Sequence, residues 1–254
     1  MLSLENFRAF VQETTESAKA SGDHTVQLKY GNEVDVVKFI NGKRHTINPA
    51  SGAVDADLLF DLFDTQKCSI RLSRPHEFST SLSKLMCLSD ELFENDAGVN
   101  VYITPYPLES KVEQGFAPHY DDIDAFLLQL EGKKQWNLYK PPEETMIHDL
   151  NPSKDFDSSL ITKGKLHQYW SGTLGEGDLL YMPRGVIHYG KTFPEPKAEH
   201  QHSLHATLSN QQHNSWADLL QASFKQTMTR LTKEDIEVRG ALPTDLFSNA
   251  GKSK

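Results

Sequence analysis

The stretch Pro118-His119-Tyr120-Asp121-Asp122 leads into the apolar run Ala125-Phe126-Leu127-Leu128, and a later segment reads Gly177-Asp178-Leu179-Leu180-Tyr181-Met182-Pro183-Arg184-Gly185-Val186-Ile187-His188. Short apolar runs that are bounded by Gly, Pro and Asp are typical of β-strands. Similar signals recur between residues 100 and 209, and the segment Ser203-Leu204-His205-Ala206-Thr207-Leu208-Ser209 alternates apolar and polar residues. Several short strands with regular turns predict a β-barrel or sandwich as the main body of the chain.

Other elements are expected before this β-rich region. Helical spacing predicts helices over residues 4–11, 55–63 and 75–93, and strands are expected over 26–47 and 68–72. The cap and turn residues that bound these elements are Ser3, Asn41-Gly42, Asp55 and Pro75.

The hydrophobic spacing becomes helical again near the end of the chain. The apolar stripe consists of Trp216, Leu219, Leu220, Phe224, Met228 and Leu231. A second helix is expected to start at 232–235 and to end at Gly240. We therefore divide the chain into residues 1–213, a β-rich domain with N-terminal helical and β additions, and residues 214–254, an α-helical segment. The long polar stretch from Pro141 to Gly172 is interpreted as a surface excursion.

Composition limits the partners and the compartment. The chain has 254 residues, a net charge of −9 and no apolar run near the roughly 20 residues of a membrane span. The charge argues against direct, sequence-specific nucleic-acid binding and suits a basic protein partner, although a solubilising acidic surface explains it equally well. Cys68 and Cys87 lack metal-ligand spacing and no secretory leader is recognisable, so we expect a reducing intracellular compartment with both cysteines in the core.

His119, Asp121 and His188 are the candidate metal ligands. His119 and Asp121 are two positions apart and can point the same way in an extended segment, and strand ends at a barrel mouth can bring His188 to them. Two imidazoles and one carboxylate on one side of an ion are the arrangement of non-haem Fe(II) oxygenases, though they also bind Zn, Mn or Ni. With 11 histidines in 254 residues, about one His-x-Asp triplet is expected by chance, so a plain surface turn is the alternative.

Lys134 is the candidate cation for the far carboxylate of 2-oxoglutarate, which such an oxygenase would use as cosubstrate. It lies one hairpin beyond the metal pair and next to Trp136, and a buried ammonium needs an anionic partner. Ordinary turn lysines at Lys133 and Lys134 are the alternative. Asn100 could donate a hydrogen bond to the same ligand, or bond only to backbone.

Four further residues are candidates for contacts with cosubstrate or substrate: Arg71, Tyr102, Thr207 and Ser209. Each of the four also has an ordinary structural explanation. Eight of the remaining histidines, His200 and His202 among them, are interpreted as surface or loop residues. A second metal site at His200-Gln201-His202 is conceivable but not favoured.

Five separated segments resemble the JmjC-type ribosomal oxygenases, and they occur in the same order. They are Asn100-Val101-Tyr102-Ile103-Thr104-Pro105, Gln114-Gly115-Phe116-Ala117-Pro118-His119-Tyr120-Asp121-Asp122-Ile123, Leu128-Gln129-Leu130-Glu131-Gly132-Lys133-Lys134-Gln135-Trp136, 177–188 and Asn214-Ser215-Trp216-Ala217-Asp218. The resemblance extends from about Tyr30 to about Phe247. Within the family, Asn41-Gly42-Lys43-Arg44 and Arg239-Gly240-Ala241-Leu242-Pro243 are most similar to the nucleolar histidyl-hydroxylase branch.

The resemblance implies a mostly β fold with α additions: a double-stranded β-helix (a cupin-like jelly roll, the JmjC domain), followed by an α-helical dimerisation region. The implied Fe(II) ligands are His119, Asp121 and His188. The implied 2-oxoglutarate contacts are Lys134, Asn100 and Thr207, and the implied substrate contacts are Arg71, Tyr102 and Ser209. The implied reaction uses dioxygen to hydroxylate a histidine of a large-subunit ribosomal protein. Members are also described as histone lysine demethylases that act by the same chemistry.

The resemblance also implies a homodimer, a nuclear and nucleolar location, and a C-terminal winged helix that the sequence up to Lys254 does not include. The loop 106–113 and the stretch 155–173 look longer than in the family, and Tyr189 and Asn210-Gln211-Gln212 depart from its pattern. Two rival interpretations remain open. One is a cupin-type metalloenzyme that does not use 2-oxoglutarate, and the other is a non-catalytic chromatin or ribosome-assembly module.

Overall fold

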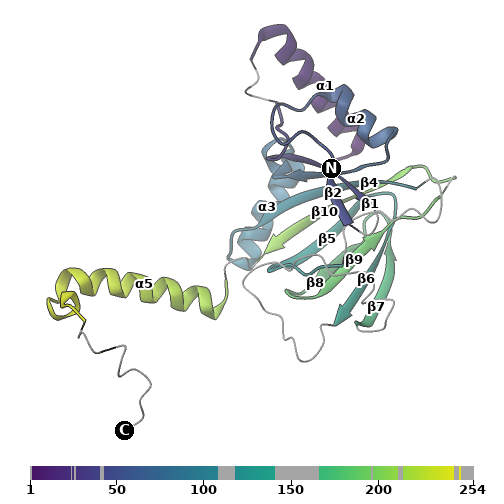
Figure 1. Cartoon of the computed structure of the whole chain (residues 1–254). Helices are drawn as coiled ribbons and strands as arrows, with labels where there is room; N and C mark the ends of the chain where they lie inside the picture. Colours follow the sequence, from purple (N-terminus) through teal and green to yellow (C-terminus); the bar gives the residue numbers. More distant parts are fainter. Residues whose placement is uncertain are drawn as a thin grey trace. The chain divides into compact units, whose positions relative to one another are not determined.

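A computed structural model describes residues 2–23, 25, 27–40, 43–107, 118–140, 166–195, 197–210, 214–242 and 246. The chain forms two compact units, Met1–Gln212 and His213–Lys254. The first unit contains all of the described strands and the second is helical. Figure 1 shows the course of the chain through both.

Two antiparallel sheets form the first unit. The larger has the order β2-β1-β3-β4-β10-β5-β8 and the smaller has the order β7-β6-β9. The strands of the larger sheet, in chain order, are β1 (Val34–Ile40), β2 (Lys43–Thr46), β3 (Ser69–Ser73), β4 (Gly98–Pro105), β5 (Asp124–Glu131), β8 (Leu179–Met182) and β10 (His202–Asn210). Those of the smaller sheet are β6 (Lys134–Lys140), β7 (His167–Leu174) and β9 (Ile187–Lys191).

The two sheets pack face to face. Leu127 of β5 and Met182 of β8 belong to the same buried cluster as Trp136 and Leu138 of β6. The chain crosses between the sheets at a turn that contains Gly132, whose φ of +63° suits glycine. This face-to-face pairing of antiparallel sheets confirms the expected jelly-roll architecture, the double-stranded β-helix.

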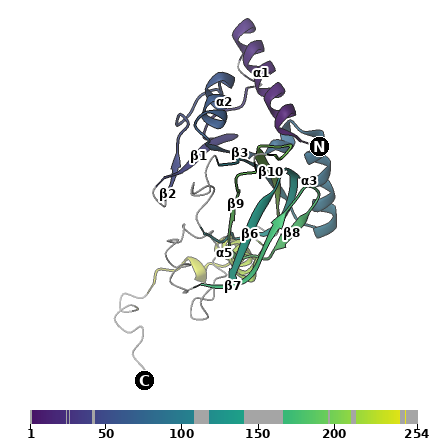
Figure 2. The ribbon, with the colours of Figure 1, turned by 90° about the vertical axis from the view of Figure 1, so that its right-hand side faces the viewer.

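Helices cover the other face of the larger sheet. They are α1 (Leu4–Ser21), α2 (Ala56–Asp64) and α3 (Thr80–Phe93), and Figure 2 shows them from a second side. Phe7, Phe60 and Leu82 from these helices join Val101 and Leu204 of the sheet in the main apolar core. None of the described helices is long and apolar enough to span a membrane.

Capping residues fix the starts of two of these helices as expected. The Ser3 side chain accepts a hydrogen bond from the Asn6 N–H, and the Asp55 side chain accepts one from the Leu58 N–H. Each bond satisfies an N–H that has no partner inside its helix. Strands β1 and β2 pair with Ile40 opposite Lys43, which fits a two-residue turn, although Asn41 and Gly42 lie outside the described residues.

Several sequence-based boundaries are wrong. Pro75 opens a short 3-10 helix, η1 (Pro75–Glu77), and α3 begins only at Thr80, after Ser79 takes an extended backbone conformation. Residues 167–172 belong to β7, because their backbone pairs with β6, whereas they were expected in a polar excursion. Residues 141–165 of that excursion lie outside the described residues. His188 follows β8 as expected, but it is also the second residue of β9, a strand that the sequence analysis did not expect.

Two further expectations about the same unit also fail. Strands β5 and β6 are consecutive, yet they belong to different sheets and do not form a hairpin. Cys68 is buried as expected, but Cys87 is exposed on α3.

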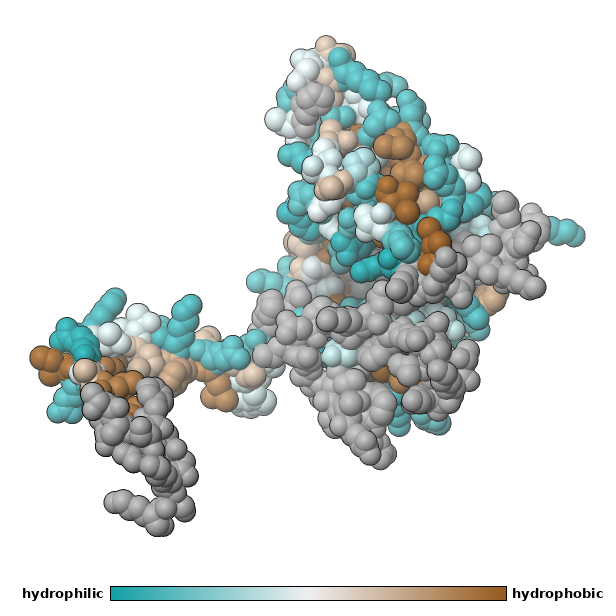
Figure 3. Space-filling model, in the orientation of Figure 1, coloured by the Kyte–Doolittle hydropathy of each residue, from teal (hydrophilic) through white to brown (hydrophobic). Residues whose placement is uncertain are grey.

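The second unit consists of α5 (Trp216–Glu234) and the short 3-10 helix η2 (Glu237–Arg239). Ser215 and Asp218 form a capping box at the start of α5. The helix α5 continues to Glu234, so the second helix starts later than expected, as the short η2, and it ends at Gly240 as expected. The apolar side chains of α5 are largely exposed, and Trp216 is 80% exposed. Figure 3 shows this apolar surface along α5. Dimerisation through α5 stays a prediction.

The two leucines Leu82 and Leu92 of α3 provide a matched test of the core. Leu82 is fully buried and Leu92 is 69% exposed. We expect Leu82→Ala to lower the free energy of unfolding by about 2–5 kcal/mol, because it leaves a cavity beneath the helix. Leu92→Ala should change it by less than about 0.5 kcal/mol. Denaturant unfolding measures both, and equal losses in the two variants would contradict this packing.

Candidate active site

His119 and His188 are held together by their own backbones. The His119 N–H donates to the His188 carbonyl over 3.1 Å, and the His188 N–H donates to the His119 carbonyl over 2.8 Å. The Gly185 N–H also donates to the Asp121 carbonyl over 3.1 Å. These three bonds join two segments that lie about 65 residues apart in the sequence, so the three predicted ligands converge before any ion is bound.

The three side chains present their ligand atoms to a common point. His119 Nε2 lies 4.0 Å from Asp121 Oδ1, and His188 Nε2 lies 3.6 Å from Asp121 Oδ2. The imidazole ring centroids are 4.5 Å apart. Ligand atoms that lie about 2.0–2.2 Å from one ion are separated by about 3 Å when adjacent. Small side-chain rotations therefore suffice for all three to bind one ion, which fits a two-histidine, one-carboxylate centre.

The hydrogen bonding and the burial of His188 favour the tautomer and the charge state that bind a metal. His188 Nδ1 lies 2.9 Å from the Val186 carbonyl oxygen, which can accept only an N–H, so the proton belongs on Nδ1 and the lone pair on Nε2. Burial and the neighbouring His119 hold the pKa of His188 well below its ordinary value. The imidazole is thus neutral near pH 7, the form that binds metals.

The ligands stand at one side of a cavity of about 270 Å³ between the two sheets. Ligand pockets in proteins start at roughly 300 Å³, so this cavity has the size of a pocket for one small molecule. Leu127, Trp136 and Met182 form part of its apolar wall. The cavity walls come from both sheets, so the site depends on their face-to-face packing.

Lys134, the first residue of β6, projects into this cavity. Its side chain is buried, and its Nζ lies 5.1 Å from the centroid of the Trp136 ring. No carboxylate among the described residues forms an ion pair with it, and burial lowers its pKa to about 7. A buried ammonium without a protein anion is suited to an anionic ligand.

Gly190 of β9 makes room for Lys134. A Cβ at Gly190 would lie 2.8 Å from Lys134 Cε and 3.2 Å from the Trp136 ring. Any larger residue at position 190 would therefore push Lys134 out of place.

His205 of β10 is a pocket residue to which the sequence analysis gave no role. It is 2% exposed, stacks on Tyr102 with ring centroids 5.1 Å apart, and meets the edge of Trp136 at 5.2 Å. His205 Nδ1 and Trp136 Nε1 are buried and find no hydrogen-bond partner among the described residues. The signal in the sequence was the alternation of 203–209, which placed His205 on the same face as Thr207.

The remaining candidates divide into two groups. Arg71, Tyr102 and Thr207 line the cavity, and Arg71 is also paired with Asp35. Asn100 and Ser209 lie further along β4 and β10 and are not among the residues that line it. Arg44 and Tyr189 line the cavity as well, although the sequence analysis did not propose them as contacts.

Comparisons with known proteins agree with this geometry. Residues 71–219 match the family model of the JmjC domain. The chain is 38% identical to Ribosomal oxygenase 1 of Danio rerio over 88% of its own length and 38% of the relative's. It is 37% identical to the bifunctional lysine-specific demethylase and histidyl-hydroxylase NO66 of Dictyostelium discoideum over 88% of its own length and 40% of the relative's. It thus spans about two fifths of these relatives.

Solved structures show the same fold. The X-ray structure of Escherichia coli YcfD superposes with a TM-score of 0.59 at 16% identity, covering 96% of this chain and 53% of the other. A structure of that ribosomal oxygenase in complex with cobalt and 2-oxoglutarate gives 0.57 at 15% identity, covering 96% and 51%. At this identity the likeness speaks for the fold alone. Together, the match to the family model and the curated relatives establish that this chain belongs to the JmjC-domain family.

Proposed function

We propose that this protein is an Fe(II)- and 2-oxoglutarate-dependent oxygenase that acts on a protein side chain. The observation that carries the proposal is the placement of Lys134, buried and without a protein anion, in the same cavity as the His119, Asp121 and His188 cluster. A metalloenzyme that did not use 2-oxoglutarate would have no use for a buried cation there. JmjC oxygenases use this metal and this cosubstrate, which supports the proposal.

In this proposal the cavity residues divide between binding iron, binding 2-oxoglutarate and excluding water. His119, Asp121 and His188 would hold the iron. Lys134 pairs with the far carboxylate of 2-oxoglutarate, next to Thr207, and Asn100 stays a proposed contact. Bound iron and 2-oxoglutarate supply the oxidising chemistry, and the apolar wall of Leu127, Trp136 and Met182 keeps water out.

For the substrate, we propose a histidine of a large-subunit ribosomal protein. The relatives named ribosomal oxygenase and histidyl-hydroxylase support this choice. Arg71 and Tyr102 line the cavity and would face the substrate, with Ser209 as a further proposed contact. Lysine demethylation is the second candidate, because the Dictyostelium relative carries both activities in its name. A nuclear location stays a prediction.

Peptide mass spectrometry tests the substrate. Ribosomal-protein peptides with histidine and histone peptides with methyl-lysine would each be incubated with protein, Fe(II), 2-oxoglutarate and air. We expect a gain of one oxygen on a histidine. Loss of a methyl group from lysine would replace this substrate with the second candidate. Absence of any change, with no succinate formed, would contradict the proposed enzyme activity of this chain.

The metal ligands are tested by His119→Ala and Asp121→Ala. Their side chains are 22% and 34% exposed, so removing them leaves the core intact and the melting temperature should shift by only a few degrees. Turnover of 2-oxoglutarate should fall to background, because two ligands cannot hold the iron correctly. The matched control is His45→Ala, an exposed histidine, which should retain turnover. Retained turnover in either ligand variant would refute the assignment.

Lys134→Met and Lys133→Met form a matched pair of neighbouring lysines. Lys134 is buried, whereas Lys133 is 58% exposed and paired with Glu195 on the surface. We expect Lys134→Met to abolish 2-oxoglutarate binding in calorimetry and Lys133→Met to leave it unchanged. Similar affinities for 2-oxoglutarate in the two variants would remove Lys134 from its proposed role.

The Lys134→Met variant also gives a prediction about pH. Burial lowers the pKa of Lys134 from 10.5 to about 7, so the unfolded chain binds more protons between these values and the ligand-free protein gains stability as the pH rises through them. Below pH 7 the folded protein bears the full cost of burying a charged Lys134. Lys134→Met removes this cost and should raise the free energy of unfolding there by a few kcal/mol. The extra stability of the Lys134→Met variant should shrink toward pH 10. A pH-independent difference would show that Lys134 is not desolvated.

A further inference from the structure

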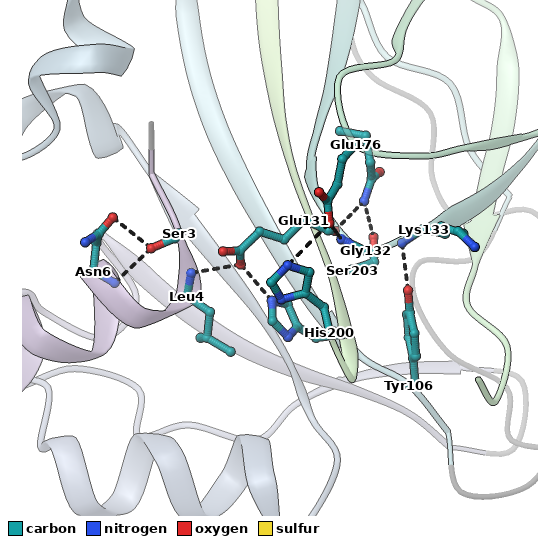
Figure 4. Close-up of polar contacts among 12 residues, drawn as sticks. Ser3, Leu4, Asn6, Tyr106, Glu131, Gly132, Lys133, Glu176, His200 and Ser203 are labelled. Atoms are coloured by element: carbon teal, nitrogen blue, oxygen red, sulfur yellow. Dashed lines mark hydrogen bonds and ion pairs between the residues drawn. The ribbon is translucent and has the colours of Figure 1, made fainter. Parts of the chain in front are cut away.

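A second group of ligand-type side chains lies away from the cavity. Glu131, His200 and His202 place one ligand atom each within 4.8 Å of one another. Glu176 lies outside that group, but its Oε1 is 3.3 Å from His200 Nε2, so a rotation of its half-exposed side chain would bring it to the other three. Figure 4 shows Glu131, Glu176 and His200 meeting in this cluster. The sequence analysis had interpreted both histidines as surface or loop residues, but His202 is buried.

The four residues come from three separate parts of the chain. Glu131 ends β5, Glu176 lies in the turn between β7 and β8, and His202 begins β10 with His200 two residues before it. The spacing His-x-His at 200–202 is the only part of this set that is local in sequence. The fold brings the two glutamates to these histidines from about 25 and 70 residues away.

Three of these residues lie close enough to share one ion, and Glu176 would complete a tetrahedral set once its side chain rotates toward them. His202 Nε2 lies 2.8 Å from Glu131 Oε2, and His200 Nε2 lies 3.3 Å from Glu176 Oε1. The two imidazole rings meet edge to face with centroids 5.3 Å apart. When Zn–N and Zn–O bonds measure about 2.0–2.2 Å, tetrahedral ligand atoms are separated by about 3.3–3.4 Å. The His200–Glu176 pair already lies at that separation, and the hydrogen-bonded His202–Glu131 pair would open by about 0.5 Å when an ion replaces the shared proton.

The charge of the cluster suits a divalent cation. Glu131 and Glu176 bring two carboxylates to the cluster, and a divalent cation would offset the charge of both. The nearby Lys133 side chain points away from Glu131 in Figure 4, and its ammonium pairs with Glu195 at 3.1 Å. Glu131 and His202 are only 13% and 10% exposed, whereas Glu176 is 52% exposed. The cluster therefore has a buried base and an open side by which an ion can enter.

Neighbouring groups hold the ligands in place. Glu131 Oε2 also accepts the Leu4 N–H at 3.0 Å, and Glu176 Oε1 accepts the Gly132 N–H at 2.9 Å. The Phe63 ring meets the His202 ring edge to face at 6.4 Å. Such outer contacts orient ligands in metal sites.

The cluster is separate from the first site. His202 lies on the face of β10 that carries Leu204 and Ala206, which pack in the core against the helices. His205 and Thr207 lie on the opposite face and line the cavity. A ligand in the cavity therefore has no contact with the second cluster.

We propose that Glu131, Glu176, His200 and His202 form a structural Zn²⁺ site. Four protein ligands of nitrogen and oxygen leave no open position, as in structural zinc sites and unlike the open centre at His119, Asp121 and His188. The ion would fasten the start of β10 to the turn after β5 and the turn before β8. Through Leu4 it would also secure the start of α1.

Metal content distinguishes the two sites. In a tag-free full-length chain that carries His119→Ala and Asp121→Ala, the first site is silenced, and one zinc per chain should remain after dialysis from Zn²⁺. Adding His200→Ala, a substitution on the open side of the cluster, should reduce this to less than about 0.1 zinc per chain. His45→Ala in the same background should retain one. Absence of zinc from the silenced chain, or retention after His200→Ala, would overturn the proposal.

Thermal unfolding gives a second reading of the same chains. Zn²⁺ binds only the folded site, so it should raise the melting temperature of the silenced chain in a concentration-dependent way. Glu176→Gln should greatly weaken the rise while it leaves the metal-free melting temperature nearly unchanged, because the amide oxygen can still accept the Gly132 N–H. A rise in the His200→Ala or Glu176→Gln chain as large as in the silenced parent chain would also overturn the proposal.

Discussion

The reciprocal backbone hydrogen bonds between His119 and His188 are the constraint on which the candidate active site depends. They fix the distance between two ligands without using either imidazole. His188 belongs to β9, which pairs with β6, so the same bonds place Lys134 and Trp136 relative to the metal ligands. Gly190, two residues further along β9, leaves the space that the Lys134 side chain occupies. The short strand β9 thus positions both the metal ligand His188 and the Lys134 side chain.

The sequence predicted the β-rich architecture because it depends on short-range patterns, and it predicted that His119, Asp121 and His188 would lie together. The alternation of residues 203–209 correctly separates the core face of β10 from the cavity face. His119 and Asp121 converge because they are two positions apart, and the family resemblance connected them with His188. The sequence analysis placed Lys134 at the site because it expected a hairpin between β5 and β6. These strands form no hairpin. The position of Lys134 follows instead from the crossing between the two sheets at Gly132.

The features that could not be predicted depend on contacts across the fold. Nothing near His205 in the sequence indicates that Tyr102 and Trp136 will enclose it, because these residues come from different strands. The pairing of Glu131 with His202 spans 71 positions, and no hydrophobic periodicity reports such a contact. The strand at residues 167–174 is largely exposed, so it lacks the apolar pattern by which buried strands are recognised.

Strand β10 connects the two ligand clusters. It carries His202 toward the helices and His205 and Thr207 toward the cavity, with a register shift between Leu204 and His205 where it pairs with β5. Shifts of this kind change the twist of a strand and the direction of the side chains beyond it. An ion that held His200 and His202 would fix the strand just before the shift, and therefore the direction in which His205 and Thr207 enter the cavity. In this arrangement a metal that takes no part in the chemistry would still set the shape of the pocket in which the chemistry occurs.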